Sequence, residues 1–133
     1  YKRYIDSVIK KSNINRQVHF GGVVHNVLER LRYSDIFVLP SESEGFSLAL
    51  TEAMSVGLPV VGYKNCSSVN ELIVNGKNGF LCEDGIDDLA EKLSVLMQNK
   101  NLRVRFGVNS HEMMKEYAPK KIWDKWENLI NTI

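Results

Sequence analysis

Short apolar runs alternate with amphipathic segments along the chain, and this alternation is typical of a parallel sheet covered by helices. Apolar residues recur at helical spacing in seven segments, at about residues 4–12, 24–31, 48–55, 69–74, 86–97, 102–117 and 119–133. β-rich runs predict strands at residues 17–20, 36–39, 60–61 and 79–81. The run 36–39 is apolar throughout, which is typical of a strand buried on both faces. We therefore expect an α/β fold with a doubly wound, Rossmann-like parallel sheet and a helical tail.

Local signals set the expected bounds of the elements and of the domain. Gly57 stands where a helix C-terminal glycine belongs, and Pro59 cannot continue the helix. Residues 1–118 are expected to form an α/β core, and residues 119–133 a C-terminal helix of the same domain. Such a fold opens with a strand, whereas this chain opens without Met and with a helical pattern. We therefore expect a single domain that is truncated at its N-terminus.

The charge balance argues against one class of function. In 133 residues, 17 Lys and Arg stand against 16 Asp and Glu, so the basic excess of a nucleic-acid binder is missing. The apolar runs are far shorter than the roughly 20 residues that span a bilayer, and no signal peptide opens the chain. We expect a cytoplasmic protein with at most a peripheral contact at the inner face of the membrane. Cys66 and Cys82 form no CxxC pair, and we expect buried free thiols rather than a disulfide.

Residues 40–52 run from a predicted buried strand into a helix, where open parallel sheets bind ligands. Gly45 allows a ligand to approach the backbone closely. The amides of Phe46, Ser47 and Leu48 fall in the first helical turn, where backbone amides have no partner within the helix. Free amides and the positive end of the helix dipole favour an anion, so the segment predicts a phosphate site.

Two glutamates flank these amides. Glu44 precedes them on the loop, and Glu52 follows eight residues later on the helix. A carboxylate accepts two hydrogen bonds from a vicinal diol, so both side chains suit sugar hydroxyls in one crevice. The alternative is that Glu44 only complements the helix dipole and that Glu52 is a solvated helix residue.

A longer pattern carries a family resemblance. Its central residues are Phe37-Val38-Leu39-Pro40-Ser41-x-x-Glu44-Gly45-Phe46-Ser47, Glu52-Ala53-Met54 and Gly57-Leu58-Pro59-Val60-Val61. Its flanking residues are Val18-x-Phe20-x-Gly22, Glu71-Leu72-Ile73-x-x-Gly76-x-x-Gly79 and Asp88-Leu89-Ala90. In order and spacing the pattern resembles retaining glycosyltransferase family 4, which has the two-domain GT-B architecture and an E-x7-E motif. The resemblance covers about residues 18–96 and implies a C-terminal, donor-binding domain.

The resemblance implies a role for each residue of the site, with a nucleotide diphosphate sugar as the donor. Glu44, the catalytic candidate, would contact hydroxyls of the donor sugar, and Glu52 those of the ribose. The amides of residues 45–48 would meet the sugar and the diphosphate. The residues expected on the side of the base are Gly22, Val23, Val24 and His25.

The resemblance also implies what the whole protein does. Such an enzyme moves a sugar to a glycan or lipid acceptor, for example in polysaccharide biosynthesis, and needs neither a metal nor another cofactor. The family's acceptor-binding N-terminal domain lies outside this chain. So does its Arg and Lys pair, which stabilises the leaving diphosphate. We therefore expect the isolated chain to be inactive.

The sequence departs from the family pattern at two places. Ser47 stands where a second glycine is usual, so its hydroxyl is a possible hydrogen-bond donor to the ligand. Ser67 and Ser68 replace the glycines common before the downstream glutamate. Glu44 resembles the nucleophile of retaining hydrolases, but the family resemblance favours substrate positioning, with attack on the face from which the diphosphate departs.

Other residues are functional candidates with weaker support from the sequence. Glu42 and Glu44 form an E-x-E pair that geometry alone leaves open as a metal site, but the resemblance implies no metal. His19 is expected to be structural or exposed. Trp123 and Trp126 are expected in the core, although the resemblance implies that a tail helix packs on the N-terminal domain and exposes apolar surface without it.

Two other functions remain open at this point. A non-catalytic nucleotide- or phosphate-binding regulatory or interaction domain can use the same sheet. A flavodoxin-like signalling domain would instead need an acidic cluster at the strand ends rather than two diol-binding glutamates.

Overall fold

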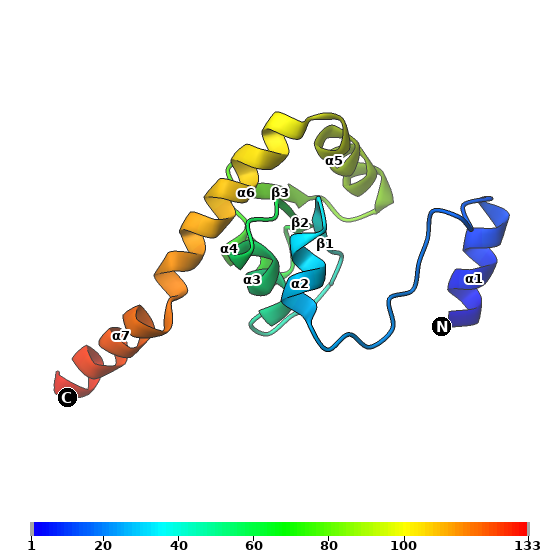
Figure 1. Cartoon of the computed structure of the whole chain (residues 1–133). Helices are drawn as coiled ribbons and strands as arrows, with labels where there is room; N and C mark the ends of the chain where they lie inside the picture. Colours follow the sequence, from blue (N-terminus) through cyan, green and yellow to red (C-terminus); the bar gives the residue numbers. More distant parts are fainter. Residues whose placement is uncertain (1, 133) are drawn as a thin grey trace.

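The computed structural model describes residues 2–132 and contains a three-stranded parallel sheet with the order β1-β2-β3 (Figure 1). The strands are β1 (Phe37–Leu39), β2 (Val60–Tyr63) and β3 (Gly79–Cys82). The helices are α1 (Lys2–Lys11), α2 (Val27–Arg32), α3 (Leu48–Ser55), α4 (Ser67–Leu72), α5 (Ile86–Gln98), α6 (Lys100–Met114) and α7 (Pro119–Asn131), with a 3-10 turn η1 (Lys115–Tyr117) between the last two. The predicted α/β class with a parallel sheet is confirmed, and residues 1 and 133 of the expected domain lie outside the described range.

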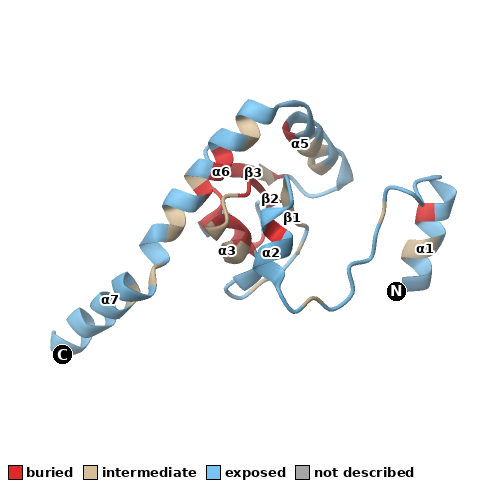
Figure 2. Cartoon of the chain, viewed as in Figure 1, coloured by how far each residue is buried: buried red, intermediate tan, exposed pale blue. Residues whose placement is uncertain are grey.

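Helices cover both faces of the sheet. Val60 and Val61 are consecutive residues of β2, so their side chains point to opposite faces. Val60 belongs to a buried cluster with residues of α3 and α4, and Val61 to a second cluster with Leu96 of α5 and Phe106 of α6. Figure 2 shows the buried residues gathered between the sheet and these helices. The sheet is therefore doubly wound, as expected.

The strand predicted at residues 17–20 is wrong. These residues have no regular secondary structure and belong to a long connection between α1 and α2, which leaves α1 to one side of the sheet (Figure 1). A strand needs a neighbour to pair its backbone groups, and within residues 2–132 no strand lies beside this segment. The connection packs on α1 instead, since the Lys2 ammonium lies 5.7 Å from the ring centroid of Phe20.

The expectation that β1 is buried on both faces is also wrong. All three of its residues are half-buried. The reason is the position of the strand in the sheet, because β1 pairs with β2 alone among the described residues and so forms an edge. The apolar run predicted the strand itself but overstated its burial.

The helix α3 begins and ends where the sequence predicts. Ser47 is its N-cap, and the Leu50 amide donates to the Ser47 hydroxyl oxygen at 3.4 Å. Gly57 follows the C-cap with φ +82°, in the left-handed region that favours glycine. A Cβ added at Gly107 of α6 would lie 2.1 Å from the Gly57 carbonyl oxygen, so the two backbones touch at this end of α3.

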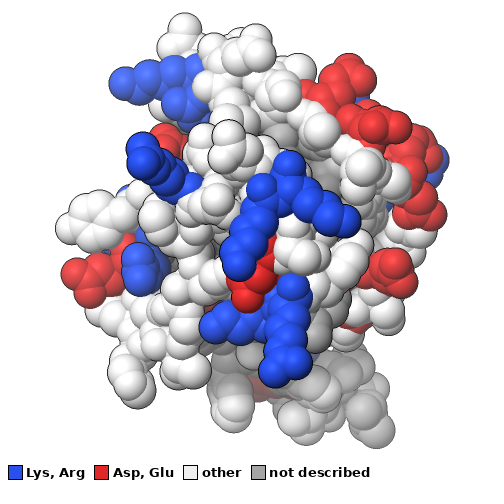
Figure 3. Space-filling model, turned by 90° about the vertical axis from the view of Figure 1, so that its right-hand side faces the viewer, with Lys and Arg blue, Asp and Glu red and all other residues white. Residues whose placement is uncertain are grey.

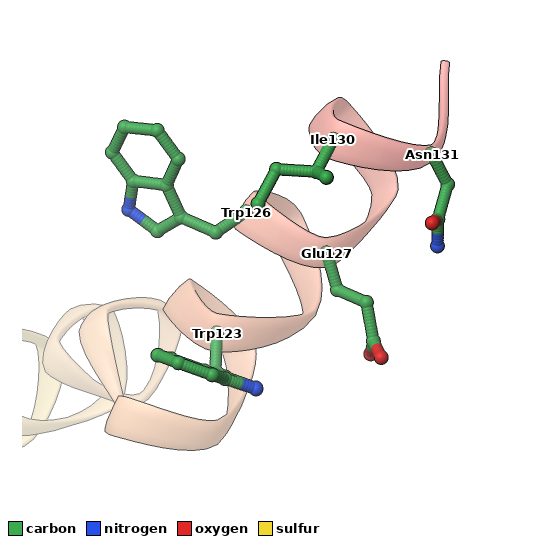
Figure 4. A pocket seen from close by; sticks show the side chains of 5 residues that line it. All are labelled: Trp123, Trp126, Glu127, Ile130 and Asn131. Atoms are coloured by element: carbon green, nitrogen blue, oxygen red, sulfur yellow. The ribbon is translucent and has the colours of Figure 1, made fainter. Parts of the chain in front are cut away.

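The expectation that Trp123 and Trp126 lie in the core is wrong. Trp123 is 71% exposed, and the apolar side chains of Trp126, Leu129 and Ile130 on α7 are exposed as well. The helix extends away from the sheet (Figure 1), so no described element covers it. The α7 side chains drawn in Figure 4 line an open pocket of about 520 Å³. The alternative that followed from the resemblance, an exposed apolar surface on the tail helix, agrees with the structure.

Candidate functional site

The carboxyl ends of the three parallel strands meet at one edge of the sheet, and the β1–α3 loop (residues 40–47) lies at this edge. The loops after β2 and β3 are linked to each other beside it. Asn65 donates to the Asp84 carboxylate at 2.8 Å, Lys64 forms an ion pair with Glu83, and the Tyr63 hydroxyl donates to the Gly85 carbonyl. These links hold two of the three strand-exit loops in place at the edge where a ligand would bind.

The amides of residues 45–48 are free at the start of α3. The first amides of the helix with an acceptor are those of Leu50, which donates to the Ser47 hydroxyl, and Thr51, which donates to the Ser47 carbonyl. Within residues 2–132, the amides of residues 45–48 have no hydrogen-bond acceptor. A Cβ added at Gly45 would meet nothing within 4 Å, so the space over this amide is open. The loop therefore offers a group of unpaired donors at the positive end of a helix, with open space at Gly45.

Glu44 and Glu52 are placed on the two sides of these amides, both half-buried. Among the described residues neither carboxylate has a hydrogen-bond partner or an ion-pair partner. Ser47, not Glu44, makes the capping hydrogen bond of α3. Glu44 therefore does not cap α3 through a hydrogen bond, and both carboxylates are without a partner among the described residues.

Ser47 is compatible with its position. Its φ is −78°, an ordinary value, so the backbone does not require the glycine that is usual here in the family. The residue is 3% exposed, and its hydroxyl accepts the capping hydrogen bond. That bond uses a lone pair and leaves the hydroxyl proton free to be donated.

The residues expected on the side of the base lie in the irregular connection before α2. Gly22 has φ +63°, Val23 is 93% exposed, Val24 is half-buried and His25 is exposed. No hydrogen bond or ion pair of the described residues joins them to residues 44–52. Glu44, the free amides and Glu52 lie in one continuous segment, and no hydrogen bond or ion pair of the described residues ties the base-side group to it.

Sequence reasoning missed one contact of this segment and named one residue, Ser68, whose hydroxyl is unsatisfied in the structure. The ring of Tyr117 packs on Phe46 of the β1–α3 loop, with centroids 6.1 Å apart. Periodicity could not reveal this contact, because the two residues lie far apart in the chain. The Ser68 hydroxyl, in the first turn of α4, is buried and has no hydrogen-bond partner among the described residues. The signal in the sequence was that Ser68 stands where the family pattern commonly has a glycine.

The two cysteines are buried free thiols, as expected. Burial raises the pKa of the Cys82 thiol to about 11, and the nearby Asp88 carboxylate adds to the rise. The thiol is therefore neutral at physiological pH and is a poor nucleophile.

Charge and metal-ligand patterns add no second site. Acidic and basic side chains both occur on the face in Figure 3, in keeping with the net charge of +1. Residues 2–132 hold no group of three or more His, Cys, Asp and Glu side chains that could bind a metal ion. Over the same range, each helix is too short or too polar to cross a membrane.

The sequence model of the family described as glycosyl transferases group 1 matches residues 1–118. The chain belongs to this family. A poly(ribitol-phosphate) alpha-N-acetylglucosaminyltransferase of Staphylococcus aureus is 32% identical over 133 residues, which cover 98% of this chain and 27% of that protein. An N-acetyl-alpha-D-glucosaminyl L-malate synthase of Bacillus anthracis is 33% identical over 124 residues, or 92% of this chain and 32% of the relative.

Solved structures show the same fold. A complex of a variant of S. aureus TarM with fondaparinux, alpha-GlcNAc-glycerol and UDP superimposes with a TM-score of 0.88 at 32% identity, over 98% of this chain and 27% of that chain. Anabaena HepE in complex with UDP gives a TM-score of 0.92 at 21% identity, over 100% and 37% of the two chains. These likenesses confirm the Rossmann-like α/β fold expected for half of a GT-B glycosyltransferase. The chain spans about a quarter to a third of the length of the relatives it matches.

Proposed function

We propose that this chain is the donor-binding domain of a retaining glycosyltransferase of family 4, which moves a sugar from a nucleotide diphosphate sugar to a glycan or lipid acceptor. One observation carries the proposal. The amides of residues 45–48 are free at the N-terminus of α3 and lie between two half-buried carboxylates without partners, Glu44 and Glu52. Membership of a glycosyltransferase family supports it.

The free amides of Gly45, Phe46, Ser47 and Leu48 supply the first part of the mechanism. They bind the diphosphate and the nearest sugar oxygens, helped by the positive end of the helix dipole. When the glycosidic bond breaks, negative charge develops on the leaving diphosphate. Donors that are already oriented stabilise this charge without reorganising, and this lowers the barrier to departure.

The two carboxylates supply the second part. Glu52 accepts hydrogen bonds from the ribose hydroxyls, and Glu44 from hydroxyls of the donor sugar. Both acids thus hold the donor so that its anomeric carbon faces the acceptor on the side from which the diphosphate leaves. Glu44 acts here by positioning the sugar, and the acceptor oxygen is the group that attacks.

The base and the nucleotide are further parts of the proposal. Gly22, Val23, Val24 and His25 form the loop that meets the base once the connection before α2 folds against the site. UDP is the nucleotide to test first, because the TarM variant that is 32% identical to this chain was crystallised with UDP.

The rest of the proposal concerns the whole enzyme. An acceptor-binding domain completes the active site, which fits the small share of each relative that this chain spans. We propose that transfer needs no metal and no further cofactor, and that the enzyme works in the cytoplasm or at the inner face of the membrane. Capsular polysaccharide biosynthesis, named for an S. aureus relative that is 31% identical, supports a role in making a surface polysaccharide.

Amide NMR of the 133-residue chain tests the donor site. UDP, GDP and ADP are titrated in turn, and the account expects one of them to shift the amides of residues 45–48. A dissociation constant on the order of 1 mM suffices, since that is about 4 kcal/mol of binding. The control is Glu42→Ala, an exposed neighbour in the same loop, which should leave the shifts unchanged. If no nucleotide moves these four amides at saturating concentration, the proposed site is wrong.

A further inference from the structure

An aromatic contact links the β1–α3 loop to the turn between α6 and α7. The ring centroids of Phe46 and Tyr117 lie 6.1 Å apart and the ring planes are inclined by 42°, within the range of a favourable aromatic pair. Phe46 remains 59% exposed, so the contact covers one part of its ring and leaves the rest open. The pair therefore restrains the loop without filling the space above it.

Tyr117 lies in η1, at the end of a segment (α6 and η1) that packs against α3. Near the C-terminal end of α3, the Gly107 backbone touches the Gly57 carbonyl, and His111 Nδ1 lies 2.7 Å from the Ser55 carbonyl oxygen. Further along α6, η1 reaches the loop at the N-terminal end of α3. The contacts occur in reverse order along the two segments, so α6 and η1 run antiparallel to α3 over its whole length.

The turn that holds Tyr117 is itself restrained on both sides. Lys115 Nζ donates to both oxygens of the Glu112 carboxylate, at 2.6 and 2.8 Å, and Lys121 of α7 forms an ion pair with Glu116. Met114 packs partly buried against the cluster that includes the core residues of α3. The Tyr117 ring is thus presented to the loop from a well-supported backbone.

Among the described residues, no hydrogen bond involves residues 40–46, whereas Ser47 is already fixed by its burial and by the two bonds it accepts at the start of α3. The capping hydrogen bonds begin at Ser47, and the amides of residues 45–48 have no acceptor among the described residues. Gly45 has open space around its Cα. The ring contact of Phe46 therefore ties the part of the loop that carries the Gly45 and Phe46 amides to the body of the protein.

We propose that Tyr117 is a positioning residue of the donor site: it holds Phe46, and through it the amides that bind the donor diphosphate. This inference rests on the proposed function. Without the ring, the loop would have to be ordered each time a donor binds, and that ordering costs free energy. Loss of the aromatic pair should weaken UDP binding by about two- to tenfold.

The first experiment needs no ligand. Backbone order parameters of the Gly45 and Phe46 amides are measured by ¹⁵N relaxation in the unmodified chain, Tyr117→Ala and Tyr117→Phe. Values near about 0.85 are expected for the unmodified chain and for Tyr117→Phe, and values toward about 0.6 for Tyr117→Ala. Tyr33→Ala, at an 85% exposed tyrosine after α2, is the matched control and should behave like the unmodified chain. Equal order parameters in all four proteins would overturn the inference.

The second experiment titrates the same four proteins with UDP. Tyr117→Ala should bind more weakly, while Tyr117→Phe should restore the affinity because it keeps the ring. If the unmodified chain binds at residues 45–48 and Tyr117→Ala binds equally well, the role of Tyr117 is refuted and the donor site stands. A third outcome is that the order parameters respond as expected but UDP shifts none of these amides in any protein. In that case Tyr117 restrains the loop, but the proposed donor-binding function is wrong.

Discussion

The helices α3 and α7 both carry large apolar side chains but have opposite surroundings. In α3, Leu50, Ala53 and Met54 are fully buried, because the helix lies between the sheet and α6. In α7 no residue is buried, and the helix leaves the body of the molecule (Figure 1). The comparison shows that periodicity identifies the apolar side of a helix, whereas the rest of the fold decides what covers that side.

Truncating one side chain on each helix should give the largest difference between α3 and α7 in the free energy of unfolding. Met54→Ala opens a cavity in a packed core and should lower the free energy of unfolding by about 2–5 kcal/mol. Leu129→Ala removes a side chain that is 52% exposed and should change it by less than about 0.5 kcal/mol. Urea unfolding followed by circular dichroism measures both. A large loss for Leu129→Ala would show that α7 is covered in solution.

The backbone contact between α3 and α6 can be broken separately. Gly107→Ala places a Cβ against the Gly57 carbonyl oxygen, a backbone atom that cannot move aside, and should cost about 1–3 kcal/mol or more. Gly45→Ala is the matched change at an open glycine and should leave stability within about 0.5 kcal/mol. Thermal unfolding compares the two variants. Equal melting temperatures would contradict the close approach of α6 to α3.

The starts of the two helices also differ. Ser47 caps α3 with its side chain, so Ser47→Ala should cost about 1 kcal/mol and Ser47→Gly only a few tenths. No side-chain hydrogen bond caps α7, which begins at Ala118 and Pro119, so Ala118→Gly should have little effect. Urea denaturation measures the change in the free energy of unfolding for each of the three variants, from the shift of the midpoint at an unchanged m-value. A loss for Ala118→Gly as large as that for Ser47→Ala would contradict the difference in capping.

Alkaline pH should destabilise the fold through Cys82 of the buried sheet, a kind of group that α7 lacks. The pKa of Cys82 is raised in the folded state, from 9.0 to about 11, so the folded protein holds this proton more tightly. The resulting stability is present below about pH 9 and is lost as the pH rises toward 11. Unfolding at stepped pH measures it, with Cys82→Ala as the control that should lack this part of the loss. A Cys82→Ala variant with the same alkaline profile would exclude the thiol as the cause.

The sequence predicted the elements whose signals are local. Ser47 and Gly57 mark the ends of α3, and the structure has the helix at Leu48–Ser55 as expected. Residues 17–20 have strand-forming side chains too, but a strand also needs a neighbouring backbone, which the sequence of the segment cannot supply. The burial of β1 was overstated for the same reason.

The candidate site likewise has a part that is local in the sequence and a part that depends on tertiary packing. Glu44, the free amides and Glu52 lie in one continuous segment, so their spacing could be read directly from the chain. Tyr117 joins this segment only through the packing of α6 on α3. Its contribution depends on tertiary structure and has no counterpart in the local pattern.

The most direct test of the account compares the two glutamates with two ligands. Affinities for UDP and for UDP-N-acetylglucosamine are measured by amide NMR in the unmodified chain, Glu44→Ala and Glu52→Ala. Removing a charged hydrogen-bond acceptor should cost roughly tenfold in affinity or more. The account predicts that Glu52→Ala weakens both ligands, because both carry the ribose, and that Glu44→Ala weakens the sugar conjugate alone. Unchanged affinities of both variants for both ligands would contradict the assignment of residues 44–52 as the donor site.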